Sequence, residues 1–143
     1  VEACTSPKEG TAQGVIICDA SIVGGVETIG LVRSPVKVVV KDGFAVEITG
    51  EEEARRLREM LESTEDPNVY NVAELGVGLN PVSKMIGSHL QDEGVFGVVH
   101  IALGTNVAWG GTVRAATHVD LLMWRPRLEL DGKTILDNHE FRI

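Results

Sequence analysis

Aromatic residues, long apolar runs and cysteines are all scarce in this sequence. Only 4% of the 143 residues are aromatic, so branched aliphatic side chains must fill the core, as they do in sheet-rich or α/β domains. No apolar run approaches the roughly 20 residues that cross a bilayer, and no signal peptide is visible at the start. The two cysteines, Cys4 and Cys18, are too few for a disulfide framework, and reduced thiols predict a cytoplasmic protein.

Positive charge is also in short supply. The sequence has 13 basic and 21 acidic residues, which gives a formal net charge of −8. A surplus of negative charge argues against nucleic acids and anionic membranes as partners. Hydrophobic residues make up 43% of the chain, enough for a packed core. We therefore expect one domain over residues 1–143.

The apolar runs predict a strand-rich domain. Turn residues separate runs that we interpret as strands over 14–22, 28–34, 36–43, 44–50, 69–78, 95–104 and 116–124. Asp42-Gly43 and Asp131-Gly132 predict two hairpin turns. The period changes to that of a helix over about 50–63, where Thr49 and Glu52 have the spacing of a capping box. A second helix is predicted to begin at Asn80-Pro81 and to end before Gly94. The sum is an α+β fold, a strand-rich mixed sheet with about two helices.

Four ionisable residues interrupt three of these apolar strands. Glu74 lies in VAELGVG, His100 in VVHIALG, and both His118 and Asp120 in THVDLL. Residues two apart on a strand point to the same face, so His118 and Asp120 should project together. A buried charge is costly unless it is paired or coordinated. The residues alone leave two explanations open, which are hydrogen-bonded core pairs and a metal site.

If these side chains converge, nitrogen and oxygen donors would bind the metal. Zn²⁺, Co²⁺, Mn²⁺ and Fe²⁺ all accept such donors. His100, His118 and Asp120 alone make a two-histidine, one-carboxylate set of the kind that binds non-haem iron. Glu74 as an additional ligand would favour two metal ions, which can polarise a carbonyl and generate hydroxide.

Three further residues allow two interpretations each. Glu93 is either a solvated residue at the end of the second helix or a general base near the metal. Trp109 either caps the core or forms an aromatic wall for a substrate. His89, on the second predicted helix, is expected to be a packing or surface residue.

Several strings resemble the aminopeptidase T family of metallopeptidases. NVAELGVGLNP, GVVHIALGTNVAWGG, HVDLLM and LELDGKTIL match its C-terminal part in order, and the opening VEACTSPKEGTAQGVIICDASI fits a segment with a Glu five residues before a Pro. The resemblance implies a dinuclear site with Glu2, Glu74, His100, His118 and Asp120 as ligands. We predict Glu74 and Glu93 as the catalytic residues. It implies a cytoplasmic, dimeric enzyme that uses Zn, Co or Mn to hydrolyse N-terminal peptide bonds. A tyrosine ligand of that family has no counterpart here, where Val107 and Trp109 occupy the region.

The same resemblance implies a longer protein and a second possible activity. The family has an N-terminal domain ahead of the metal-bearing half, so we expect this chain to be the C-terminal part of a two-domain protein. Glu2, so near a terminus, is expected to fray. The family is similar in fold to dioxygenases that act on dihydroxypyridine, whose iron ligands would match His100, His118 and Asp120. The alternatives to a peptidase are therefore a ring-cleaving iron dioxygenase and a non-catalytic domain, with a peptide or small molecule as the expected substrate.

Overall fold

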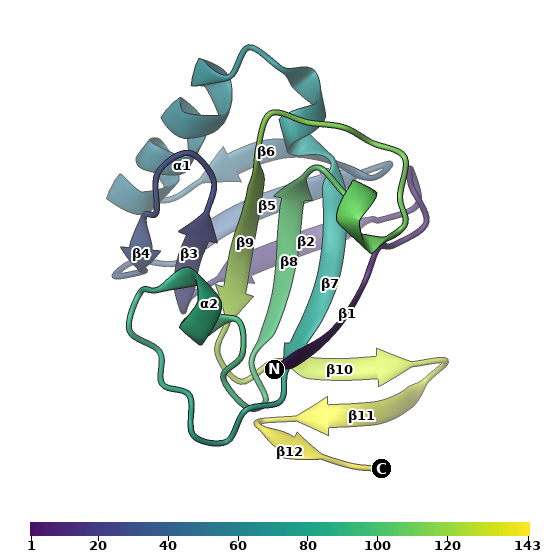
Figure 1. The fold of residues 1–143 in the computed structure, drawn as a ribbon. Helices are drawn as coiled ribbons and strands as arrows, with labels where there is room; N and C mark the ends of the chain where they lie inside the picture. Colours follow the sequence, from purple (N-terminus) through teal and green to yellow (C-terminus); the bar gives the residue numbers. More distant parts are fainter.

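The computed structural model describes all of residues 1–143 and contains three antiparallel sheets (Figure 1). The largest has six strands in the order β1-β7-β8-β9-β3-β4. Its strands are β1 (Glu2–Thr5), β7 (Val72–Gly78), β8 (Val99–Gly104), β9 (His118–Met123), β3 (Ser21–Gly24) and β4 (Gly30–Leu31). The α+β class is confirmed, and the strand pairs within the sheets are antiparallel rather than mixed.

A three-stranded sheet lies behind the large sheet in Figure 1 and encloses the main core with it. It consists of β2 (Gly14–Cys18), β5 (Val36–Lys41) and β6 (Phe44–Thr49). The helix α1 (Glu52–Ser63) adds its apolar side to this core through Ala54, Leu57, Met60 and Leu61. A separate small sheet holds β10 (Arg127–Leu130), β11 (Lys133–Asp137) and β12 (Glu140–Phe141). One face of the large sheet is therefore committed to the core, and the other is available for a site.

Both predicted hairpin turns are confirmed. Asp42 and Gly43 join β5 to β6 with φ angles of 50° and 80°, and Asp131 and Gly132 join β10 to β11 with 50° and 78°. Two successive positive φ angles are what a tight hairpin turn needs, and Asp-Gly supplies them at little steric cost.

The first predicted helix is confirmed, but its predicted capping box does not form. The helix α1 begins at Glu52 with Glu51 as its N-cap, and no side chain caps it. Thr49 is instead the last residue of β6, paired with Lys37 of β5. Thr49 therefore belongs to the β5–β6 pairing and is not available to cap the helix.

The second predicted helix is wrong over most of its length. Only α2 (His89–Asp92) is helical, and the residues from Pro81 to Ser88 form turns and irregular backbone. The buried carboxylate of Asp92 accepts hydrogen bonds from the backbone N–H groups of Ile86 and Gly87, each at 2.8 Å. Gly87 has a φ of 83°. These contacts stabilise a turn where the apolar spacing alone indicated helix.

Strand boundaries also differ from those predicted. The run 14–22 divides into β2 and the start of β3, which belong to different sheets. Residues 28–34 contribute only the two residues of β4, and the run from 69 opens with a 3₁₀ turn over Pro67–Tyr70. The strand β1 was not predicted, because its residues are mixed in polarity. None of the helices is long and apolar enough to cross a membrane.

Candidate metal centre

The register of the large sheet brings the predicted site residues onto its outer face. Ala102 of β8 pairs with Glu74 of β7 on one side and with Asp120 of β9 on the other. His100 pairs with Gly76, and His118 pairs with Gly104. Cross-strand partners share a face of the sheet. The two carboxylates are therefore separated by the methyl group of Ala102. His118 has Gly104 opposite it, and His100 has Gly76 on one side and Leu122 on the other.

Glycine at position 76 is required by the ring of His100. A Cβ atom built on Gly76 would lie 2.1 Å from His100 Nε2 and 2.2 Å from Cε1. The Nε2–Cε1 edge of the imidazole therefore lies against the backbone of β7, in space that any side chain would fill. The small residues of VAELGVG thus create the room that the charged residues occupy.

Glu2 reaches the site from the edge strand β1. Four residue pairs join β1 to β7, with Glu2 opposite Gly78. Its Oε2 atom lies 3.3 Å from His100 Nε2. The expected fraying of Glu2 is therefore wrong, since β1 is paired along its whole length.

The central contacts form a continuous chain of acids and imidazoles. Glu74 lies between the two histidines, with Oε1 3.5 Å from His100 Nε2 and Oε2 3.0 Å from His118 Nε2. His118 Nε2 is also 3.3 Å from Asp120 Oδ1. The ligand atoms of Glu74, His118 and Asp120 lie within 4.8 Å of one another, so one ion could contact all three.

The one-turn helix α2 adds two residues to the rim of this cluster. It lies over the same face of the sheet, beside β3 and β9 (Figure 1). His89 Nε2 is 2.9 Å from Asp120 Oδ2 and 3.2 Å from Glu93 Oε2. His89 is 42% exposed, as expected of a surface residue, but it also contacts two carboxylates of the cluster, which the sequence did not predict. The expectation that Glu93 is solvated is wrong, because its side chain is only 17% exposed. Its role as a base stays a prediction.

No signal in the sequence pointed to His89. Its place on a predicted helix, away from the three apolar strands, gave no reason to group it with Asp120. Only the short helix α2, turned toward β9, brings the two side chains together.

The loop after β8 fixes the ring of His118 from two directions. The carbonyl oxygen of Thr105 lies 2.8 Å from His118 Nδ1, which leaves Nε2 facing the carboxylates. The indole of Trp109 stacks on the imidazole with ring centres 4.3 Å apart and planes inclined by 13°. Trp109 therefore lies at the site and not over the main core.

Burial and charge pairing work against each other in this cluster. Burial alone would raise the pKa of Glu74, but hydrogen bonds with His100 and His118 outweigh it and lower the pKa to about 2. Burial alone would lower the pKa of His118, but Asp120 and Glu74 raise it to about 10. Without a metal, His118 therefore carries a proton at neutral pH and holds two carboxylates in their charged form.

At the rim of the cluster, the pKa values of Glu93 and His89 are both raised. Burial, followed by the nearby carboxylates, raises the pKa of Glu93, although His89 opposes this. The hydrogen bond with Asp120 raises the pKa of His89. Four carboxylates face three imidazoles here, so the cluster has an excess of acidic groups that a cation would balance.

Buried polar atoms without a partner show that the donor set suits a metal ion. Glu2 Oε2, Glu74 Oε1 and Asp120 Oδ1 are all buried and accept no hydrogen bond, although each lies 3.3–3.5 Å from an imidazole Nε2. Buried oxygens without partners are rare and costly in folded proteins. A divalent cation between them would supply the missing interactions, and oxygen and imidazole donors fit iron as well as zinc. The residues present therefore fit a metal centre.

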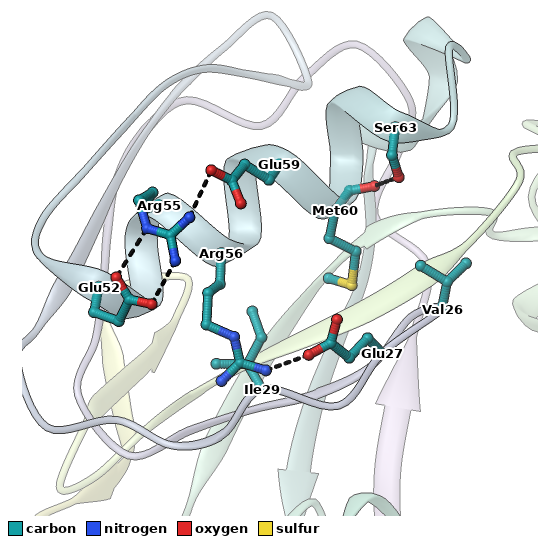
Figure 2. A pocket seen from close by; sticks show the side chains of 9 residues that line it. All are labelled: Val26, Glu27, Ile29, Glu52, Arg55, Arg56, Glu59, Met60 and Ser63. Atoms are coloured by element: carbon teal, nitrogen blue, oxygen red, sulfur yellow. Dashed lines mark hydrogen bonds and ion pairs between the residues drawn. The ribbon is translucent and has the colours of Figure 1, made fainter.

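The hollow beside α1 has none of these features. Figure 2 shows it between α1 and the segment of Val26 to Ile29, with a volume of about 300 Å³. Its two arginines are already paired, Arg55 with Glu52 and Glu59, and Arg56 with Glu27. No unpartnered buried charge points into this hollow, so it does not compete with the candidate metal centre as a functional site.

Comparison with known proteins decides the family. The profile of the NicX family, 2,5-dihydroxypyridine 5,6-dioxygenase, matches residues 2–142. The chain belongs to this family. A 2,5-dihydroxypyridine 5,6-dioxygenase of Pseudomonas putida is 27% identical to it over 143 aligned positions, covering 92% of this chain and 40% of that protein. The solved structure of the 2,5-dihydroxypyridine dioxygenase from Pseudomonas putida KT2440 has the same fold, with a TM-score of 0.85 at 22% identity over 97% of this chain.

The family match corrects the predicted identity. The resemblance to aminopeptidase T was wrong, and with it the prediction of a hydrolase that cleaves N-terminal peptide bonds. The strings that suggested it lie on the sheet that carries the ionisable cluster, and a shared fold says little about the reaction. The chain spans about two fifths of the length of the relatives it matches, 40% of the curated protein and 42% of the solved chain.

Proposed function

We propose that this chain supplies the metal centre of a dioxygenase that opens a dihydroxylated pyridine ring. The observation that carries the proposal is the set of buried oxygens of Glu2, Glu74 and Asp120 that accept no hydrogen bond and lie beside two imidazoles. The family match supports this reaction class, because the relatives are named for cleavage of 2,5-dihydroxypyridine.

His118, Asp120 and Glu74 are the proposed core of the ligand set, with His100 as the second imidazole. His100 contacts Glu74, and Glu74 contacts His118, so both rings face the same carboxylate. Two imidazoles with carboxylates are the donors that non-haem Fe²⁺ uses in oxygenases. Bound iron would supply the one-electron chemistry that lets dioxygen react with an electron-rich ring.

The residues of α2 are suited to handle the protons of a hydroxylated substrate. His89 lies at the rim with 42% of its side chain exposed, between the carboxylates of Asp120 and Glu93. A hydroxyl group that enters from this side can give its proton to Glu93, and His89 holds that carboxylate in place. Trp109 beside His118 offers an aromatic edge against which a planar ring can lie.

Metal binding is the first test, because it needs only the residues described here. The chain is loaded with Fe²⁺ without oxygen, and bound iron is measured by elemental analysis after gel filtration. One iron per chain is expected. His118→Ala should bind less than a tenth as much at the same free iron, since it removes a central ligand. His139→Ala, which removes an imidazole that contacts Phe96 and Trp124 and no residue of the cluster, should bind as the wild type does.

Turnover is the second test. The iron-loaded protein is mixed with 2,5-dihydroxypyridine, and oxygen uptake is followed together with loss of the ring absorbance. One dioxygen should be consumed for each ring, with both oxygen atoms in the opened product and the C5–C6 bond broken. A protein that binds one iron tightly yet gives neither oxygen uptake nor ring loss would contradict the dioxygenase proposal.

A further inference from the structure

The loop over residues 105–113, which carries Trp109, is organised around the side chain of Asn106. Asn106 is fully buried, and its Oδ1 accepts a hydrogen bond from the backbone N–H of Val113 at 2.8 Å. The backbone carbonyl oxygen of Asn106 accepts from the N–H groups of Trp109 at 3.1 Å and Gly111 at 3.0 Å. A Cβ on Gly111 would lie 2.1 Å from the Asn106 amide carbon. The loop therefore closes tightly on this one amide.

Glu9, which lies between β1 and β2, binds this loop through its carboxylate. Its Oε1 accepts from Asn106 Nδ2 at 2.8 Å and from the backbone N–H of Thr112 at 2.7 Å, and its Oε2 accepts from the Thr112 hydroxyl at 2.8 Å. The bonds from the Thr112 backbone and the Asn106 amide lower the pKa of Glu9 to about 2, so the carboxylate is charged at neutral pH. One side chain from the N-terminal segment thus fixes both the centre of the loop and its far end.

This loop provides both contacts that orient His118 from outside the carboxylate cluster. The Thr105 carbonyl meets Nδ1 of the ring, and the Trp109 indole covers its face. Thr105 and Trp109 flank Asn106 closely in sequence, so a shift of the Asn106 amide would move both. Partners that orient a metal-ligating histidine determine its tautomer and ring direction.

We infer that Glu9 and Asn106 form a clamp that positions His118 for metal binding, with Glu9 acting through the loop and touching neither metal nor substrate. The inference rests on the proposed function for its effect on metal affinity. Its effect on the geometry of His118 and Trp109 does not depend on that function. Loss of a residue that orients a ligand typically weakens metal binding by about 10–100-fold.

The test compares Glu9→Ala with a control that releases the same segment elsewhere. Gln13 ties the N-terminal segment to the β5–β6 turn, donating to Asp42 Oδ1 at 2.6 Å and accepting from the Asp42 N–H at 3.1 Å. Gln13→Ala therefore loosens the segment without touching the loop of Trp109. Both variants change side chains of exposed residues, so both should fold. Glu9→Gln is the conservative variant, because its amide oxygen can still accept from Asn106 and Thr112.

Two readouts separate positioning from simple stability. In a Trp124→Phe background Trp109 is the remaining tryptophan, so its emission and the ¹⁵N shifts of His118 report the stacked geometry without metal. Equilibrium dialysis with Fe²⁺ then gives the metal affinity. Glu9→Ala should change the Trp109 emission and the His118 shifts and weaken iron binding at least 10-fold. Glu9→Gln should lie between Glu9→Ala and wild type, and Gln13→Ala should match wild type.

The possible outcomes are distinct. Unchanged Trp109 emission, His118 shifts and iron affinity in Glu9→Ala would overturn the clamp, and so would equal changes in Gln13→Ala. If wild type binds no iron but Glu9→Ala still shifts the Trp109 and His118 signals, the proposed function fails and the clamp stands. If wild type binds iron and Glu9→Ala binds it equally well, the metal centre stands and the clamp fails.

Discussion

At the scale of single residues, the site depends on where side chains are absent as much as on where they are charged. His100 lies in the space that Gly76 leaves open, and the carboxylates of Glu74 and Asp120 face each other across Ala102. A larger residue at either small position would push a proposed ligand out of place. The site therefore requires the small side chains at Gly76 and Ala102 as well as the acidic ones.

Gly76→Ala should displace His100 and weaken iron binding at least 10-fold, because the new methyl group would meet the imidazole 2.1 Å from Nε2. Overpacking of this kind also lowers the free energy of unfolding by about 1–3 kcal/mol. Equilibrium dialysis and urea unfolding measure the two effects. Gly132→Ala, strained by a φ of 78° in a distant turn, is the control that loses stability but keeps its iron affinity. Normal iron binding in Gly76→Ala would contradict this account.

His118 should give the metal-free protein a stability that depends on pH. Its folded pKa of about 10 is raised from 6.5, mainly because Asp120 and Glu74 outweigh the effect of burial. A raised pKa stabilises the folded state fully below pH 6.5, and this contribution is lost as pH rises through 10. With a chelator present, the difference in free energy of unfolding between wild type and His118→Gln should shrink from pH 6.5 to 10. A difference that is flat across this range would show that His118 is not held as the charged imidazolium.

At the scale of elements, the short helix α2 and the turns before it depend on a single buried acid. Asp92 is fully buried, and its Oδ2 accepts from the Ser21 hydroxyl at 2.7 Å as well as from the N–H of Gly87. This contact ties α2 to β3 and so sets where His89 stands relative to β9. The backbone before α2 satisfies its polar groups through this side chain and not through helical bonds.

Asp92→Asn should lower the free energy of unfolding by about 2–3 kcal/mol, because an amide can accept at only one of the two oxygens that now accept three bonds. Urea unfolding followed by circular dichroism measures the loss. Asp131→Asn is the matched control, since asparagine tolerates the φ of 50° at that turn equally well. Equal stability of the two variants would mean that Asp92 does not hold this segment together.

At the scale of the whole molecule, two sheets share a core on one side and leave the outer face of the larger sheet for chemistry. The strands β7, β8 and β9, which carry the proposed ligands, are also the central strands of that sheet, with β1 and β3 on either side. Core packing against Leu103, Val119 and Leu121 on the inner face fixes the backbone from which the ligands project. The proposed metal centre is therefore coupled to global stability.

Iron should raise the melting temperature through this coupling. A ligand at 100 times its dissociation constant adds about 2.7 kcal/mol, which corresponds to a shift of roughly 10 °C for a domain of this size. Differential scanning calorimetry under anaerobic conditions, with and without a chelator, measures the shift. A double change of His118 and Asp120 to alanine should abolish it, whereas His139→Ala should retain it. An equal shift in the double variant would point to iron bound elsewhere.

Local signals in the sequence were enough for the hairpins, for α1 and for the choice of the buried ionisable residues. Asp-Gly pairs fix a tight turn by their own backbone preferences, and the apolar period of residues 52–63 is strong enough to define one helix. Glu74, His100, His118 and Asp120 stood out because each breaks an apolar strand, and a buried charge requires a partner.

Only the tertiary structure decided which partners those charges have. The register of four strands placed the acids beside the imidazoles, and pairing with β7 held Glu2 in the cluster. Asp92 stabilises turns where a helix was predicted, through its bond with Ile86. It also ties α2 to Ser21, which is distant in sequence, and α2 carries His89 to Asp120. The sequence by itself determined the ionisable groups that had to be compensated, since desolvation depends on residue type. The fold decided that these ionisable groups meet at one place, because only sheet pairing brings residues from separate segments within bonding distance.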